Sequence, residues 1–142
     1  MSVWPLLEDD EMPARSAAVI DDIRATRKTD FINNFWRVLA NDPALLERTW
    51  ASLKDVMGPG VLDPKVKEML YVAVSIANSC EYCIRSHTAA ARAKGMSEAE
   101  LGELMAIVGM ASETNRLAIG LQVPVDAAFG VPFAGAREPD AG

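Results

Sequence analysis

The sequence predicts an all-α protein, a single domain of six or seven helices over residues 1–142. Apolar residues recur at intervals of three and four, as in Leu45, Leu46, Trp50 and Leu53. Signals that start helices appear repeatedly along the chain. No segment alternates between apolar and polar residues for long enough, between turn signals, to make a convincing strand.

The helix boundaries follow from capping residues. Asp42 and Asp63 each offer an N-cap acceptor before a proline at the first helical position. Ser97 and Glu100 form a capping-box pattern, and Gly95 just before them is a typical helix terminator. Together with the periodicity, these marks predict helices over residues 14–27, 30–40, 43–57, 64–78, 81–94, 98–110 and 112–121.

The two ends of the chain read differently from the middle. Residues 1–12 are acidic and contain a proline, which predicts an N-terminal arm on the surface. The segment 123–142 holds three of the eight prolines and three glycines, which predicts an irregular C-terminal tail.

Composition narrows the class of protein and its partners. Half of the residues are hydrophobic, which excludes wholesale disorder. The formal net charge is −6, and this argues against nucleic acid or an anionic membrane as a partner. The longest apolar-rich run, Met69 to Ala77, is nine residues, whereas a membrane-spanning helix needs about 20. Without a secretory signal at the N-terminus, the expected location is the cytoplasm, where thiols stay reduced.

The chemistry is expected at Cys80, Cys83 and His87, because two cysteines three positions apart in a reducing compartment suggest a redox or metal role. Cys83 and His87 are four residues apart, so on a helix they share one face. Cys80 lies one turn earlier, at the expected start of the helix, where the helix dipole favours a thiolate. His87 could take a proton from Cys83 or hold its thiolate.

Glu68 is the expected fourth member of the site. On one straight helix it would lie about 18 Å from Cys80, at 1.5 Å per residue. If the chain instead turns near residues 77–79 into an antiparallel helical hairpin, positions 68 and 87 are equidistant from the turn and face each other. Glu68 would then orient His87, and the apolar residues around Glu68 would make an unpaired carboxylate costly.

These residues resemble the alkylhydroperoxidase-D-like branch of the carboxymuconolactone decarboxylase superfamily. The motif of that branch is Glu, eleven residues, Cys-x-x-Cys, three residues and His, which this chain has at Glu68, Cys80, Cys83 and His87. The segment AAARAKGMSEAEL that follows the motif is also similar to that family, and the resemblance covers about residues 20–122. The chain departs from well-studied hydroperoxidases at Tyr82, where they have a second histidine.

The resemblance implies thiol-dependent reduction of a hydroperoxide without a cofactor or a metal. It implies that Cys83 attacks the hydroperoxide, that Cys80 resolves the product as a disulfide, and that Glu68 and His87 relay protons. A dithiol partner, such as a lipoyl- or thioredoxin-like protein, would supply the reducing equivalents. The resemblance further implies a homotrimer or homohexamer.

Other interpretations of the cysteine pair remain open at this point. Cys80, Cys83 and His87 could hold zinc, although the sequence has no further Cys or His as a fourth ligand. The cysteines could also be buried as small apolar residues. At the level of function, the alternatives are the ring-lactone decarboxylase activity of the superfamily, which does not use a CxxC motif, and a redox sensor that oxidises without turnover.

Overall fold

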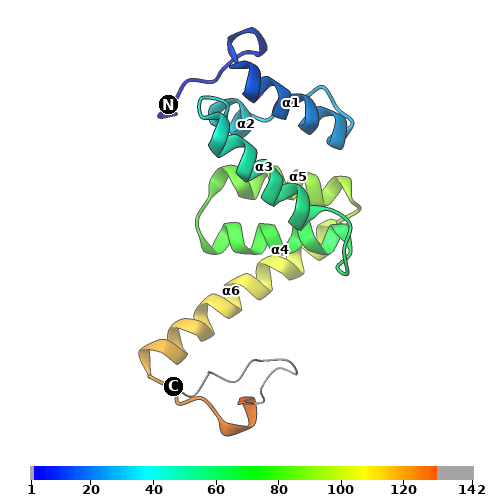
Figure 1. The fold of residues 1–142 in the computed structure, drawn as a ribbon. Coiled ribbons are helices and arrows are strands. Elements are labelled where there is room, and N and C mark those ends of the chain that lie inside the picture. The colour runs from blue at the N-terminus through cyan, green and yellow to red at the C-terminus, as the bar shows by residue number, and fades with distance from the viewer. Residues whose placement is uncertain (1, 131–142) are drawn as a thin grey trace. The chain divides into compact units, whose positions relative to one another are not determined.

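A computed structural model describes residues 2–130, and all the regular elements among them are helices (Figure 1). The predicted all-α class is therefore confirmed for this part of the chain. The six α-helices and two short 3-10 helices are η1 (Asp9–Glu11), α1 (Ala14–Arg27), α2 (Asn34–Leu39), α3 (Pro43–Met57), α4 (Pro64–Ala77), α5 (Glu81–Ala93), α6 (Glu98–Gly120) and η2 (Ala127–Phe129).

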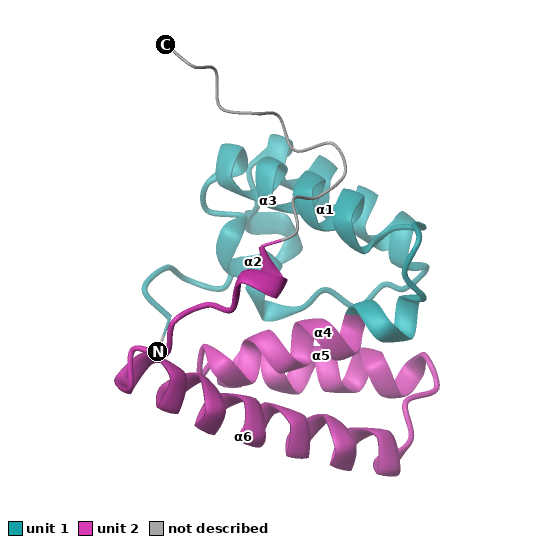
Figure 2. Cartoon of the chain, turned by 90° about the horizontal axis from the view of Figure 1, so that it is seen from below, with its two compact units in different colours: residues 1–67 teal, residues 68–142 magenta. Residues whose placement is uncertain are grey.

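The chain divides into two compact units, Met1–Lys67 and Glu68–Gly142 (Figure 2). In the first unit, α1 and α2 both pack against α3. Trp36 of α2 and Trp50 of α3 meet edge to face at the centre, with ring centroids 5.5 Å apart. The buried core of this unit consists of Ile20, Ile23, Ile32, Trp36, Ala40, Leu46 and Trp50.

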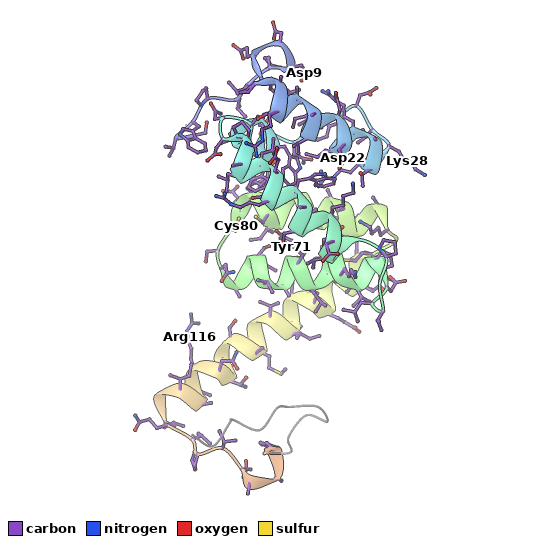
Figure 3. All side chains as sticks on the ribbon, viewed as in Figure 1. Asp9, Asp22, Lys28, Tyr71, Cys80 and Arg116 are labelled. Carbon is purple, nitrogen blue, oxygen red and sulfur yellow. The ribbon has the colours of Figure 1, made fainter. Side chains whose placement is uncertain are left out.

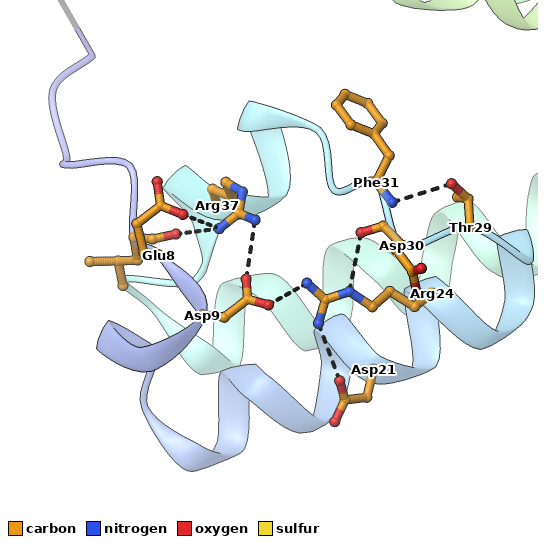
Figure 4. Close-up of polar contacts among 9 residues, drawn as sticks. Glu8, Asp9, Asp21, Arg24, Thr29, Asp30, Phe31 and Arg37 are labelled. Carbon is orange, nitrogen blue, oxygen red and sulfur yellow. Dashed lines mark hydrogen bonds and ion pairs between the residues drawn. The ribbon is translucent and has the colours of Figure 1, made fainter.

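Within the first unit, charge pairs hold the N-terminal segment against α1 and α2 (Figure 4). The Asp9 carboxylate accepts a hydrogen bond from Arg24 at 2.5 Å and forms an ion pair with Arg37 at 3.1 Å. Arg37 also donates to the backbone carbonyl of Leu7 at 2.9 Å. Leu7 and Met12 pack against the core, so the segment expected as an arm is fastened by both polar and apolar contacts.

The second helix is shorter than predicted, because the residues before it form a turn. The helix was expected over 30–40 and spans Asn34–Leu39. The Thr29 hydroxyl accepts a hydrogen bond from the Phe31 N–H at 3.2 Å, and Arg24 donates to the Asp30 carbonyl at 3.3 Å. These local bonds satisfy the backbone without a helix.

The last two predicted helices, 98–110 and 112–121, are one continuous helix, α6. Its capping box at Ser97 and Glu100 is present as predicted. The polar residues in the middle do not interrupt the helix; the Ser112 hydroxyl donates to the Val108 carbonyl at 2.7 Å within it. No proline stands there, and an isolated glycine costs a helix only about 1 kcal/mol relative to alanine.

The other helix boundaries agree with the prediction to within one residue. Helices α1 and α3 match it fully, and α4 and α5 each end one residue earlier. In the second unit, α4 and α5 lie side by side in both views (Figures 1 and 2). Among residues 2–130, no helix combines the length and the apolar character that crossing a membrane requires.

The first unit should depend strongly on the tryptophan pair at its centre. Trp36 is 2% exposed, so Trp36→Ala should lower the free energy of unfolding by about 3–5 kcal/mol. Phe31→Ala is the matched control, because Phe31 is 68% exposed and its loss should cost about 0.5 kcal/mol or less. Urea unfolding followed by far-ultraviolet circular dichroism measures both; equal losses would contradict this account of the core.

Candidate active site

A tight turn between α4 and α5 sets the position of Cys80. Ser79 adopts the left-handed conformation, with φ of 56°. The Ser79 N–H donates to the Ile76 carbonyl and the Cys80 N–H to the Ser75 carbonyl, both at 3.0 Å. This pair of bonds is a Schellman motif, which ends α4 and has Cys80 as its last residue.

Cys80 also begins the next helix, because it is the N-cap residue of α5. Its Sγ accepts the backbone N–H of Cys83 at 3.4 Å. Hydrogen bonds from Cys83, from its side chain first and then from its backbone, lower the pKa of Cys80 below the usual thiol range. The start of a helix also favours negative charge, so Cys80 is the more readily ionised of the two thiols.

Cys83 has the opposite electrostatics. Burial, followed by the neighbouring Cys80, raises the pKa of Cys83 to about 11. From the sequence, His87 was expected to take a proton from Cys83 or to hold its thiolate, since it follows Cys83 by one helical turn. Among residues 2–130, however, the structure has no hydrogen bond between Cys83 and His87. The pKa of Cys80 is lowered and that of Cys83 is raised, so Cys83 is the less readily ionised thiol. Both cysteines are free thiols and partly exposed.

Glu68 lies on the inward face of α4 and is 5% exposed. Its Oε2 is 2.7 Å from His87 Nδ1, and its Oε1 accepts a hydrogen bond from Lys94 Nζ at 2.5 Å. Burial acts to raise the pKa of Glu68, but the hydrogen bonds from His87 and Lys94 outweigh it and hold the pKa below its usual value. Glu68 is therefore a buried carboxylate with both oxygens engaged.

The contact with Glu68 determines how the His87 ring is protonated. A carboxylate only accepts hydrogen bonds, so Nδ1 carries a proton in both the neutral and the charged imidazole. The ring of Tyr71 stacks on the imidazole with centroids 3.5 Å apart and planes 14° from parallel. Figure 3 marks Tyr71 on α4 and Cys80 at the helix junction. Tyr71 thus covers one face of the imidazole ring, and Glu68 binds its Nδ1 edge.

The second ring nitrogen of His87 is left available. In the part of the chain that the structure describes, every buried side-chain nitrogen or oxygen has a hydrogen-bond partner, whereas His87 Nε2 has none. Nε2 must therefore be open to solvent. In the neutral imidazole it carries a lone pair, which is the requirement for a general base.

The structure brings Glu68 and His87 together and places Cys80 and Cys83 on the same helix as His87. The sequence analysis identified neither Tyr71 nor Lys94 as a member of the site. Tyr71 follows Glu68 by three positions, so both lie on one face of α4; Lys94 follows His87 by seven, which is about two turns of α5. These spacings are the signal that could have found them.

Within the described residues, no group of three or more His, Cys, Asp or Glu side chains is placed to hold a metal ion. Tyr82, which stands between the cysteines, is 42% exposed on α5.

The fold and the site define a class of helical proteins in which a buried Glu–His pair accompanies a CxxC dithiol. Residues 43–125, more than half of the chain, match the sequence profile of the Carboxymuconolactone decarboxylase family. The chain belongs to this family.

A solved structure supports the same relationship. The chain is 58% identical to the alkylhydroperoxidase AhpD core from Rhodospirillum rubrum, with a TM-score of 0.89. The match covers 93% of this chain and 99% of that one. No curated protein matches the chain.

Alkylation should distinguish the two thiols. Iodoacetamide at about pH 7.5 should label Cys80 at least about tenfold faster than Cys83, because only the thiolate reacts. Peptide mapping after short exposure measures the two rates. In Cys80→Ser, the remaining Cys83 should stay slow until the pH approaches its high pKa, since burial is the largest cause of that shift. Faster labelling of Cys83 in the wild type would contradict this assignment.

Proposed function

We propose that the protein reduces hydroperoxides with the dithiol Cys80 and Cys83, assisted by Glu68 and His87. The observation that carries the proposal is the buried Glu68–His87 pair, which leaves Nε2 as a base on the helix that bears both free thiols. Membership of the family by itself supports either a peroxidase-type or a decarboxylase-type role. The likeness to the alkylhydroperoxidase AhpD core favours the first.

The first step would be attack by Cys83 on the hydroperoxide. His87 Nε2 takes the thiol proton, and the Cys83 thiolate attacks the terminal oxygen of ROOH. The O–O bond breaks, Cys83 becomes a sulfenic acid, and the alkoxide leaves as an alcohol with the proton returned by His87. A thiol with a pKa of about 11 is almost entirely protonated at neutral pH, so this step needs a base.

The second step would join the two sulfurs. The Cys80 thiolate attacks the sulfenic sulfur of Cys83, the S–O bond breaks, and the departing hydroxide takes up the proton that the Cys80 thiol released, which gives water. The two thiols are oxidised to a disulfide by two electrons, while one hydroperoxide is reduced to an alcohol and water. The low pKa of Cys80 suits this role, because a resolving thiol must attack as thiolate.

Turnover would require an external dithiol that returns the disulfide to two thiols. A lipoyl- or thioredoxin-like protein is the partner class that the family resemblance suggests. Cys80 is the sulfur with the lower pKa, so it is the better leaving group when a partner thiolate attacks Cys83.

We also propose that the chain works as a homotrimer or homohexamer, as the resemblance suggests. Helix α6 carries several large apolar side chains that are exposed in the single chain, and burial of such side chains favours association between chains. They include Ile107, Met110, Leu117 and Ile119. Sedimentation equilibrium measures the number of chains.

Catalysis should depend on the charge of Glu68. Glu68→Gln keeps the shape but removes the carboxylate, so it should slow the reaction of the reduced protein with cumene hydroperoxide by about ten- to a thousandfold. Stopped-flow loss of free thiols measures the rate. Glu103→Gln, the same change at an exposed position of α6, is the control and should leave the rate unchanged.

The same assay separates the proposal from its rivals. With excess dithiothreitol, a peroxidase consumes many equivalents of hydroperoxide, whereas a sensor stops after one disulfide per chain. A ring-lactone decarboxylase would keep its activity in Cys83→Ser, since that chemistry does not use the dithiol. Wild-type rates no faster than those of free dithiothreitol would overturn the proposal.

A further inference from the structure

Lys94 has a partner that a lysine at a helix end seldom has. It is the C-cap residue of α5, where a cation suits the helix dipole and most often serves only that purpose. Here its ammonium reaches back to Glu68, 26 residues earlier, and donates to Oε1 at 2.5 Å. The Lys94 side chain is 40% exposed, whereas that of Glu68 is 7% exposed. The pair therefore connects the surface to the buried carboxylate.

A second ion pair at the same end of α5 is an ordinary exposed surface pair. Arg92 pairs with Glu98 at 2.8 Å, and their side chains are 49% and 74% exposed. Pairs of this kind lie in water and contribute little to stability or to the charge state of either partner. Arg92 thus provides a matched control for Lys94: a cation two residues earlier whose carboxylate is solvated.

The backbone around Lys94 is held in place by a Schellman motif. Gly95 has φ of 91°, a conformation that favours glycine. The Gly95 N–H donates to the Arg92 carbonyl at 2.9 Å, and the Met96 N–H donates to the Ala91 carbonyl at 3.0 Å. Met96 is 5% exposed and anchors the turn in the interior of the unit. The backbone at Lys94 is therefore fixed at the end of α5, and from there its ammonium reaches Glu68.

We propose that Lys94 is a positioning residue of the dithiol site, which holds Glu68 ionised and in the orientation that meets His87. The inference rests on the proposed function. Lys94 occupies Oε1 and His87 occupies Oε2, so the carboxylate cannot rotate without losing one of two short contacts. A carboxylate that is fixed and charged keeps the proton on Nδ1 and the lone pair on Nε2.

Loss of Lys94 should make Glu68 easier to protonate. Burial, which raises the pKa of Glu68, would then be opposed by His87 alone. The other titratable groups near this cluster are Tyr71, Cys80 and Cys83. Burial, then Cys83, Cys80 and Glu68, raise the pKa of Tyr71, so Tyr71 stays neutral in the acidic range. In the described residues, α6 contributes no hydrogen bond or ion pair to Glu68 or His87.

The test compares Lys94→Met, Lys94→Arg and Arg92→Met in the reduced full-length chain. The Glu68 carboxyl carbon is followed by ¹³C NMR against pH and assigned by its absence in Glu68→Gln. Its titration should move to higher pH in Lys94→Met, return toward the wild type in Lys94→Arg and stay unchanged in Arg92→Met. Lys94→Gln serves in the same way if Lys94→Met fails to fold.

Thiol loss with cumene hydroperoxide supplies the functional readout. In Lys94→Met the rate should fall on the order of tenfold at about pH 5.5 and less at pH 8, because protonated Glu68 no longer supports the base. A purely structural lysine would lower the melting temperature and leave this pH profile unchanged, which would overturn the inference. An unmoved Glu68 titration would overturn it as well.

The two readouts separate this inference from the function on which it rests. If the Glu68 titration moves but even the wild type does not react with hydroperoxide, the proposed function fails. The role of Lys94 is then decided by the pH dependence of Cys83 alkylation, which should change in Lys94→Met and not in Arg92→Met.

Discussion

The organisation of the second unit depends on one buried carboxylate, that of Glu68. A charge out of contact with water is costly unless it is paired, and removing one partner of such a pair commonly costs about 3–5 kcal/mol. Glu68 meets this constraint with His87 on one oxygen and Lys94 on the other. Both partners come from α5 and its C-terminal cap, so these two contacts hold α4 against α5 and orient the imidazole at the same time.

The junction between the two helices provides the second constraint. Cys80 closes the Schellman motif of α4 with its N–H and caps α5 with its sulfur. Its place is therefore determined by the backbone of both helices, whereas Cys83 lies one turn further along and is more shielded. The difference in pKa between two cysteines of one short motif follows from this geometry. Cys80 ionises more readily, whereas Cys83 needs a base to lose its proton.

Much of the fold could be predicted because its signals are local. The Asp42 and Ser97 caps and the Gly95 terminator act within one turn, and the helices begin or end where these residues indicate. The approach of Glu68 to His87 could also be anticipated from equal spacing about a turn. The continuity of α6 could not, since the polar residues near its middle read as a break in the sequence and are nevertheless accommodated within one helix. Burial of Cys83 and the reach of Lys94 to Glu68 depend on packing between helices, which spacing alone does not specify.

The account centres on an imidazole that keeps its proton on Nδ1, and His87 is the only histidine in the chain. Long-range ¹H–¹⁵N correlation spectra of the reduced protein report directly which nitrogen of that ring is protonated. In the neutral form the account predicts a protonated Nδ1 and a bare Nε2, with the Nδ1 proton signal lost in Glu68→Gln. A neutral ring protonated at Nε2 would contradict it, because His87 would then have no lone pair to offer Cys83.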